Sequence, residues 1–273
     1  MTNQSESKSL RFLYNNAFGR VILKLLTARW ISKLCGAFLD TSLSKPLIKG
    51  FVKNNNINLD DFESDNFTCF NDCFCRKIKD GRRTFPTDEK VFFAPCDGLL
   101  SAYRITDKTV LPIKQSAYTI NRLLDNDVLA DDFKDGVCLV FRLCVNHYHR
   151  YCYSASGRKG NNIFIKGKLH TVRPIALEAG PVFCENCREY TVIDTDHFGK
   201  IAQIEVGAML VGKIKNHHGA GNIKRTWEKG MFLYGGSTIV MLLQKDKVDI
   251  NEKFFENTAN NIETDVVMGQ PLN

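Results

Sequence analysis

Residues 230–245, "GMFLYGGSTIVMLLQK", form the apolar run that decides the fold class of this chain. The run combines Phe, Tyr, Ile and Val with Leu and Met, a composition typical of a buried β-strand. It also contains Gly235 and Gly236, followed by Ser237 and Thr238. Glycine inside a strand costs backbone entropy and supplies no side chain for packing, so these residues indicate a purpose beyond packing.

Similar short runs recur from residue 91 onward, separated by Asp, Asn and Gly. Residues 54–90 are polar and predict loops or short helices. The apolar residues of 119–133 have helical spacing, and the tail from residue 253 predicts one short strand, "IETDVVMG". The predicted architecture is α+β: a helical N-terminal part followed by a predominantly antiparallel β body. The other predicted strand runs are "VFFAP", "LLSAYRI", "VCLVFRLCV", "NIFIKGKLHTV", "PVFCENCREYTVIDT" and "KIAQIEVGAMLVGKI".

Basic residues concentrate near the N-terminus. Residues 1–53 contain nine Lys and Arg against two acidic residues, a net charge of +7 that equals that of the whole chain. A basic segment on a neutral body favours an anionic partner surface. With 44% hydrophobic and 25% charged residues, the composition is that of a soluble globular protein, and no apolar run is long enough to span a bilayer. No secretory signal pattern is present, so we expect the protein inside the cell.

Residues 8–35 predict an amphipathic helical segment, although Asn15, Asn16 and Gly19 argue against one unbroken helix. From the residues alone, two interpretations stay open. The segment lies in the plane of an anionic membrane, or it packs on the protein's own core with a solvated basic face. The apolar positions with roughly helical spacing are Leu10, Leu13, Ala17, Val21, Leu25 and Trp30.

Ten cysteines raise the question of a metal site or disulfides. Without a secretory signal, free thiols are expected. Cys184 and Cys187 have the spacing of half a zinc site, but no matched second pair follows, and the cluster Cys69, Cys73 and Cys75 lacks that spacing. We expect no metal, and reduced cysteines that pack as small hydrophobic residues.

Two further stretches contain side chains suited to catalysis. "FAPCDGLL" (93–100) places Asp97 in a turn after a predicted strand, where an ordinary turn residue is the alternative. "VNHYHRYCYSASG" (145–157) contains His147 and His149, which strand alternation would direct to one face; a paired-His metal site is the alternative there, but it lacks a third ligand. Asp, His and Ser together supply the parts of a nucleophilic triad, although Ser237 lacks the Gly-x-Ser-x-Gly flanks of a hydrolase elbow.

At these stretches the sequence resembles the phosphatidylserine decarboxylase family of pyruvoyl-dependent enzymes. The family's serine lies in a Leu-Gly-Ser-Thr or Gly-Gly-Ser-Thr motif near the C-terminus, here residues 235–238. Glu228, Gly230 and Phe232 resemble the Gly-Glu-x-Gly and aromatic run upstream of that motif. "APCDG" is similar to the family's Pro-x-Asp-Gly turn, and "HYHRY" to its Asp-Tyr-His-Arg-aromatic motif. The resemblance covers about residues 91–243, with the motifs in order.

The resemblance implies that the chain cleaves itself between Gly236 and Ser237. Attack of the Ser237 hydroxyl on the Gly236 carbonyl gives an ester, and elimination and hydrolysis leave a covalent pyruvoyl cofactor derived from Ser237. The products would be a β chain, residues 1–236, and an α chain, residues 237–273. The pyruvoyl carbonyl would form a Schiff base with phosphatidylserine, which loses carbon dioxide to give phosphatidylethanolamine.

His149, with Asp97, is the expected base. Two departures from the family pattern bear on this assignment. His147 stands where many members have Asp, and Cys152 stands where many members carry the second His that serves as the triad base. The role of base therefore falls on His149 here, with His147 as the alternative.

A lipid substrate also favours the membrane interpretation of the basic segment. We therefore expect residues 1–53 to be a membrane-binding segment, residues 54–273 to be the catalytic domain, and the protein to be peripheral on the cytoplasmic side of the cell membrane. A homodimer is left open, and no nucleic acid partner is expected. The alternatives are a pyruvoyl decarboxylase of another amino-bearing substrate, and a non-catalytic basic module that binds lipid or nucleic acid.

Overall fold

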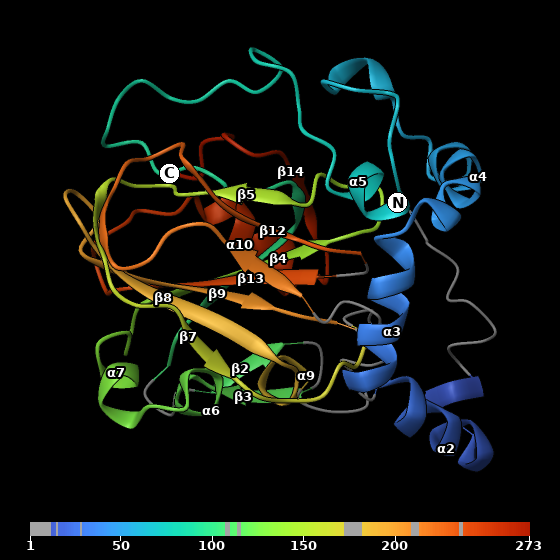
Figure 1. Cartoon of the computed structure of the whole chain (residues 1–273). Helices are drawn as coiled ribbons and strands as arrows, with labels where there is room; N and C mark the ends of the chain where they lie inside the picture. The colour runs from blue at the N-terminus through green and yellow to red at the C-terminus, as the bar shows by residue number, and fades with distance from the viewer. Residues whose placement is uncertain are drawn as a thin grey trace.

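The structure is a computed structural model of the chain (Figure 1). It describes residues 12–14, 16–27, 29–106, 110–113, 116–171, 182–208, 213–234 and 237–273.

A nine-stranded sheet forms the centre of the molecule, in the order β11-β6-β8-β9-β13-β4-β1-β14, with β7 paired to β8. Each of these pairings is antiparallel. The antiparallel β body predicted from the apolar runs is therefore confirmed. The strands are β1 (Gly98–Arg104), β4 (Val137–Leu143), β6 (Gly157–Lys159), β7 (Ile163–Ile165), β8 (Arg188–Thr195), β9 (Lys200–Val206), β11 (Gly221–Ile223), β13 (Ser237–Leu243) and β14 (Thr264–Val266).

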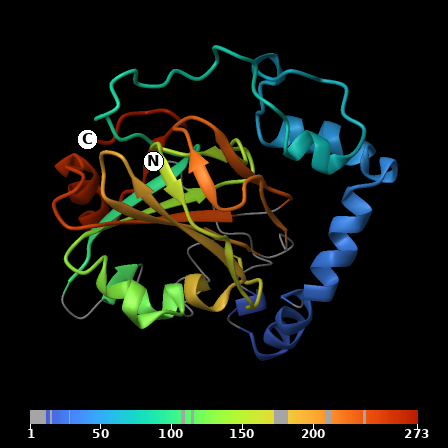
Figure 2. The same cartoon turned by 60° about the vertical axis from the view of Figure 1, so that its left-hand side comes forward.

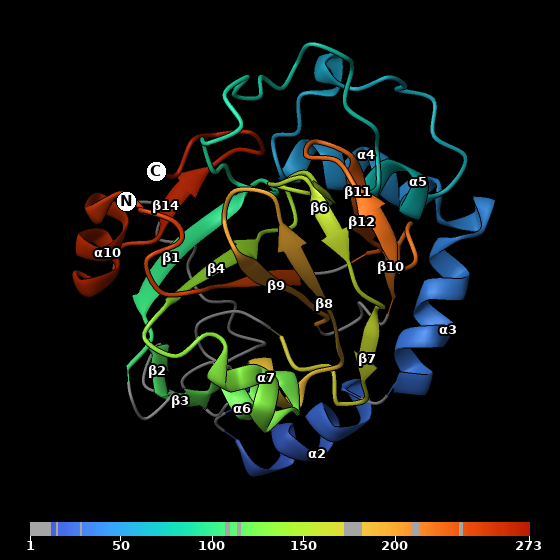
Figure 3. The ribbon, with the colours of Figure 1, turned by 90° about the vertical axis from the view of Figure 1, so that its left-hand side faces the viewer.

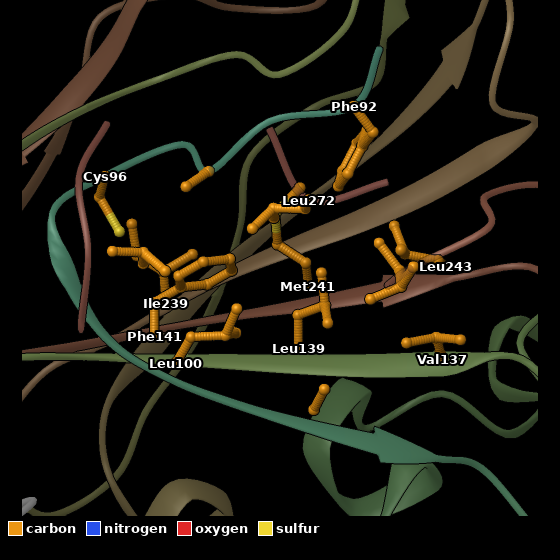
Figure 4. Close-up of a cluster of buried hydrophobic side chains, with 14 of the residues drawn as sticks. Phe92, Cys96, Leu100, Val137, Leu139, Phe141, Ile239, Met241, Leu243 and Leu272 are labelled. Atoms are coloured by element: carbon orange, nitrogen blue, oxygen red, sulfur yellow. The ribbon is translucent and has the colours of Figure 1, made fainter. Parts of the chain in front are cut away.

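Strand β13 lies between β4 and β9, and all seven of its residues are buried. Its side chains alternate between two hydrophobic cores, one on each face of the sheet. Val240 and Leu242 enter the first core. Ile239, Met241 and Leu243 enter the second, where they pack against Leu139 and Phe141 of β4 (Figure 4).

Short helices and a hairpin cover the first core. Helices α6 (Ile120–Leu124), α7 (Asp127–Asp131) and α9 (Val182–Glu185) lie on this side of the sheet with the hairpin β2 (Val110–Ile113) and β3 (Ser116–Thr119) (Figure 1). The Thr119 hydroxyl accepts a hydrogen bond from the Arg122 amide, which caps the start of α6.

The second core is closed by helix α10 (Glu252–Ala259) and by a small antiparallel sheet in the order β10-β12-β5. Asn251 caps α10, and Phe254 directs its ring into the core. The small sheet consists of β5 (Arg150–Cys152), β10 (Ile214–Asn216) and β12 (Glu228–Phe232). This second sheet matters for the site because it brings residues 149–152 beside residues 228–232.

The N-terminal helices form an arc along one side of the β body (Figures 2 and 3). One helix ends at Leu26 and the next begins at Arg29, so the segment is not one unbroken helix, but the break does not lie at Gly19, which is inside the first of these helices. None of the described helices is long and apolar enough to cross a bilayer. The segment comprises α2 (Ala17–Leu26), α3 (Arg29–Leu39), η1 (Ser42–Ser44), α4 (Pro46–Asn54), η2 (Leu59–Asp61) and α5 (Phe70–Phe74).

Several local predictions are corrected. Residues 230–245 are not one strand, because β12 ends at Phe232 and β13 begins at Ser237. Asp97 precedes β1 instead of following a strand, since Phe93 makes only an isolated bridge to Pro271. His147 lies in a turn and His149 lies just before β5. Neither histidine is inside a strand, so the alternation of side chains along a strand does not determine which way they point.

Two helices were not predicted. Residues 182–185 form α9 although they belong to a run predicted as strand, and α10 lies in a tail where only a strand was expected. The strand in that tail is confirmed as β14.

Candidate active site

Two short connectors link the large sheet to the small one. One joins β4 to β5, and the other joins β12 to β13. They start and end as neighbours, because Leu143 pairs with Ser237 in the large sheet while Arg150 pairs with Met231 in the small sheet. The Phe232 amide also donates to the His149 carbonyl at 3.0 Å. Ser237 therefore lies at the large-sheet end of one connector and His149 at the small-sheet end of the other.

Ser237 is fully buried at the first position of β13, and its Oγ has no hydrogen-bond partner among the described residues. An unpartnered buried hydroxyl costs about 1–3 kcal/mol of stability. Ser154 Oγ is in the same condition, so it is the position of Ser237 in the Gly-Gly-Ser-Thr motif that makes this serine the candidate for chemistry. Gly235 and Gly236, and with them the expected cleavage site, lie outside the described residues.

His149 is fully buried, and its geometry selects a tautomer. Its Nδ1 lies 3.0 Å from the carbonyl oxygen of His147, so Nδ1 carries the proton and donates it. The Nε2 atom then carries the lone pair, and it has no partner within the described part of the chain. His149 thus presents a free acceptor nitrogen, the form required of a general base.

Burial lowers the pKa of His149 well below its ordinary value, and the positive charge of Arg76 and the neighbouring His147 lower it further. The imidazole is therefore neutral at physiological pH, with Nε2 able to take a proton. Burial also lowers the pKa of His147. His147 has a different arrangement, because its Nδ1 accepts from the Cys144 amide at 3.1 Å, so its lone pair on that atom is already used.

Helix α5 covers His149, which the sequence did not predict. The Phe74 ring lies 4.0 Å from the His149 ring, centroid to centroid, and Tyr234 packs edge-on against Phe74 at 5.3 Å. Arg76 follows this helix and donates to the carbonyl of Asn146 at 3.0 Å and to that of His147 at 3.2 Å. These contacts keep water from His149 and hold the turn that accepts its Nδ1 proton.

The Asp97 carboxylate has hydrogen-bond partners other than His149, the partner that the sequence predicted. Its carboxylate accepts from Arg83 Nη2 at 2.6 Å and from the Met268 amide at 2.9 Å. Asp97 and His149 form no hydrogen bond with each other, although both lie in the described part of the chain. Arg83 was missed because it lies in the polar stretch 54–90, which has no hydrophobic periodicity to mark it.

Cys152 lies beside the Asp97 turn, because its amide donates to the Pro95 carbonyl at 2.9 Å. Burial raises the pKa of its thiol well above the ordinary value, and the charges of Glu228 and Asp97 add to the effect. A neutral thiol is a poor base, so Cys152 cannot serve as the base here. The geometry thus favours His149 over Cys152 as the base.

Three cysteines of the two clusters each form a separate hydrogen bond with the backbone. Cys69 caps α5 by accepting from the Asp72 amide, Cys75 donates to the Phe232 carbonyl at 3.3 Å, and Cys187 donates to the Gly167 carbonyl at 2.9 Å. No group of three or more His, Cys, Asp or Glu side chains in the described ranges is arranged to hold a metal ion.

The sequence model of the family described as phosphatidylserine decarboxylase matches residues 70–272. This chain belongs to the phosphatidylserine decarboxylase family. It is 41% identical over 270 residues to "Phosphatidylserine decarboxylase proenzyme 2" of Clostridium acetobutylicum, covering 98% of this chain and 92% of the relative. It is 37% identical to a proenzyme of that name from Clostridium kluyveri and 39% identical to one from Ruminiclostridium cellulolyticum, over 97% and 96% of this chain and 92% and 90% of those relatives.

The names of these relatives describe proenzymes. In this chain Ser237 is buried, and its Oγ has no hydrogen-bond partner among the described residues. The residues present also fit a pyruvoyl group at position 237, because the unpartnered Ser237 Oγ and His149 Nε2 supply the hydroxyl and the base that its formation requires.

Proposed function

We propose that this chain is a phosphatidylserine decarboxylase that cleaves itself between Gly236 and Ser237 and acts at a membrane surface. The observation that carries the self-processing step is the pair of buried, unpartnered atoms: a hydroxyl that can donate and an imidazole nitrogen that can accept. The family and the similarity to the proenzymes support the reaction and its substrate.

In the first step, His149 Nε2 takes the hydroxyl proton while Ser237 Oγ bonds to the carbonyl carbon of Gly236. The peptide C–N bond breaks, and the proton passes to the departing nitrogen of Ser237. His149 Nε2 then takes the proton from the Ser237 Cα, the Cβ–Oγ bond breaks, and Gly236 leaves as a carboxylate that retains this oxygen. The enamine left at residue 237 tautomerises to an imine, water adds to the imine carbon, and the nitrogen leaves as ammonia. Closure by Phe74 favours these transfers, because a dry site keeps His149 neutral.

When present, the pyruvoyl group supplies the electron sink for loss of carbon dioxide. The chain's own contribution is to bind the lipid headgroup, to exclude water and to provide the proton that replaces the carboxyl group. The proposed donor is the buried His149, which returns a proton that its Nε2 has first taken up.

Processing is tested by intact-mass measurement of the purified protein. We expect two fragments that meet between residues 236 and 237, the second having lost ammonia, and a single chain for Ser237→Ala. Ser154→Ala is the matched control, because Ser154 is also buried with an unpartnered Oγ. An intact wild-type chain that decarboxylates phosphatidylserine would contradict the proposal. A liposome assay with phosphatidylserine against free serine separates this activity from that of a relative using another amine.

We infer that the N-terminal helices attach the enzyme to the cytoplasmic face of the cell membrane. Trp30, Leu34 and Phe38 recur every fourth residue on α3 and have exposed fractions of 59%, 63% and 46%. Leu43 and Leu47 continue this lipid-facing stripe with 76% and 49%. The exposed lysines of the segment, each worth ~1 kcal/mol at an anionic leaflet, include Lys33, Lys45, Lys49 and Lys53.

Flotation with phosphatidylserine vesicles tests this attachment. Replacing Trp30, Leu34 and Phe38 together by Ser should weaken binding by about tenfold or more, because their apolar contact with the bilayer is lost. The control replaces three exposed apolar residues of the β body, Val128, Ile262 and Val267, by Ser. Equal loss of binding by both triple variants would refute attachment through α3.

A further inference from the structure

A cavity of about 320 Å³ lies between α3, α5 and the β12–β13 connector. Tyr234 lines it, three residues before Ser237, and the Tyr234 ring packs on Phe74, which in turn covers His149. The cavity is therefore next to the buried site, separated from it by two aromatic rings. Its apolar wall includes Leu169 and Leu233.

The polar side chains of this cavity favour an anion. Lys33 and Lys213 both line it, and neither forms an ion pair with any described residue. Ser32 is 3% exposed, and its Oγ has no hydrogen-bond partner in the described ranges. The carboxylate in the lining, Asp40, accepts from the Asn71 amide at 2.7 Å, and it balances only one of the two ammonium charges.

An apolar groove continues from this cavity across Tyr234. It is lined by Leu34, Cys35, Phe38 and Leu39 on α3, the helix that also presents the lipid-facing stripe. A molecule that occupies both spaces needs an anionic group at the lysines and hydrocarbon along the groove. A phospholipid has this combination, whereas free serine has no hydrocarbon and a nucleotide has no acyl chain.

We propose that Ser32, Lys33 and Lys213 form a phosphodiester subsite that holds the phosphate of phosphatidylserine, with an acyl chain along the groove on α3. This inference rests on the proposed decarboxylase function and goes beyond it by assigning the residues that recognise the lipid. Only a few covalent bonds separate the phosphorus from the amine of the headgroup. A phosphate held beside Tyr234 therefore binds the lipid with its serine head close to position 237.

The subsite has a kinetic consequence. Binding of the phosphate is the same in the ground state and in the transition state, because no charge develops on it. Lys33→Gln and Lys213→Gln should therefore raise KM for soluble dihexanoyl phosphatidylserine by about tenfold each and leave kcat nearly unchanged. Lys215→Gln is the matched control, since Lys215 is an exposed lysine two residues from Lys213 that does not line the cavity.

Calorimetry provides a measurement that does not depend on turnover. The ligand is dihexanoyl phosphatidylmethanol, which has the phosphodiester and acyl chains but no amine. We expect its Kd to rise about tenfold in Lys33→Gln and Lys213→Gln, to rise less in Ser32→Ala, and to stay unchanged in Lys215→Gln. Inorganic phosphate is titrated in parallel and should bind at least about a hundredfold more weakly, because it lacks the hydrocarbon.

The outcomes separate the two proposals. If the wild type cleaves itself and decarboxylates the lipid, but the cavity variants match Lys215→Gln in Kd and KM, the subsite is wrong and the function stands. If the wild type neither cleaves nor decarboxylates, the function is wrong. Binding of inorganic phosphate as tight as that of the lipid would assign the cavity to free phosphate and overturn the phosphodiester proposal.

Discussion

The N-terminal helices and the β body treat their apolar side chains in opposite ways. In β13 all seven residues are buried, and Phe141 opposite them is fully enclosed. In α3 the apolar residues Trp30, Leu34 and Phe38 remain largely exposed. The β body thus buries its apolar side chains in its own cores, whereas the N-terminal helices leave apolar side chains exposed at the surface. This difference supports the proposal that the N-terminal helices contact the membrane while the β body holds the reacting residues.

The largest expected difference in stability is between phenylalanine substitutions in the two regions. Phe141→Ala should lower the free energy of unfolding by about 3–5 kcal/mol, since it removes a fully buried ring and leaves a cavity in the second core. Phe38→Ala, at an exposed position, should change it by less than about 0.5 kcal/mol. Urea unfolding of both variants measures the difference. Equal losses would mean that α3 is part of the same packed core.

The second prediction concerns the buried ion pair of the β body. Lys229 Nζ lies 2.7 Å from Glu205, and neither side chain is exposed; burial raises the pKa of Glu205 while the ammonium opposes the rise. Lys229→Met should cost about 3 kcal/mol or more of unfolding free energy, because it leaves a buried carboxylate without its partner.

The matched variant combines Lys229→Met with Glu205→Gln. It should recover most of the loss, because no uncompensated charge is left, and chemical denaturation of the two proteins compares them. The exposed pair Lys77–Glu63 provides the contrast: it should contribute little to stability, because solvent screens both charges. A double variant as unstable as Lys229→Met would show that the pair is needed for packing and not only for charge balance.

The third prediction uses the lowered pKa of His149. Below its ordinary pKa, the unfolded chain binds a proton at this imidazole and the folded chain does not, so unfolding is favoured as the pH falls. His149 therefore contributes a loss of stability that begins near about pH 6.5 and continues down to its folded pKa, by up to about 1.4 kcal/mol per pH unit.

Unfolding of Ser237→Ala with and without His149→Gln, at about pH 7.5 and about pH 5.5, isolates this contribution. The Ser237→Ala background keeps both proteins uncleaved. The His149→Gln protein should lose less stability on acidification, by about 1 kcal/mol, although His147, His170 and His218 also have lowered pKa values and remain in both proteins. Parallel losses would show that His149 binds its proton equally in the folded and unfolded states.

The strands could be predicted because their apolar runs are local. Phe, Ile, Val and Leu in β4, β9 and β13 sit between polar turns, and each run contains enough information for its own assignment. The helix α10 could not, since its sequence is polar and it is stabilised by the Asn251 cap and by Phe254 packing on the sheet.

The pairing of site residues depends on register, which composition does not determine. Ser237 and His149 were identified as candidates from motifs, but their placement at paired connectors follows from the antiparallel pairing of β4 with β13 and of β5 with β12. Arg76 and Arg83 were missed for the same reason: they act on residues about 70 and 14 positions away, and neither belongs to a periodic pattern. The residues that tune the site are thus less visible in sequence than those that react.

The smallest effect is expected from glycine substitutions in the two regions. Gly50 lies within α4, and a Cβ there would meet no atom within 4 Å, so Gly50→Ala should stabilise α4 by about 0.5–1 kcal/mol. Amide hydrogen exchange in residues 46–54 detects this gain even where global unfolding does not.

Gly230→Ala is the counterpart in β12, where the Cβ would lie 2.3 Å from the Lys215 carbonyl oxygen and must displace backbone. It should destabilise the small sheet, so the same substitution has opposite signs in the two regions. Faster exchange in α4 of Gly50→Ala would show that this helix already packs as tightly as the β body, and the comparison between the regions would then fail.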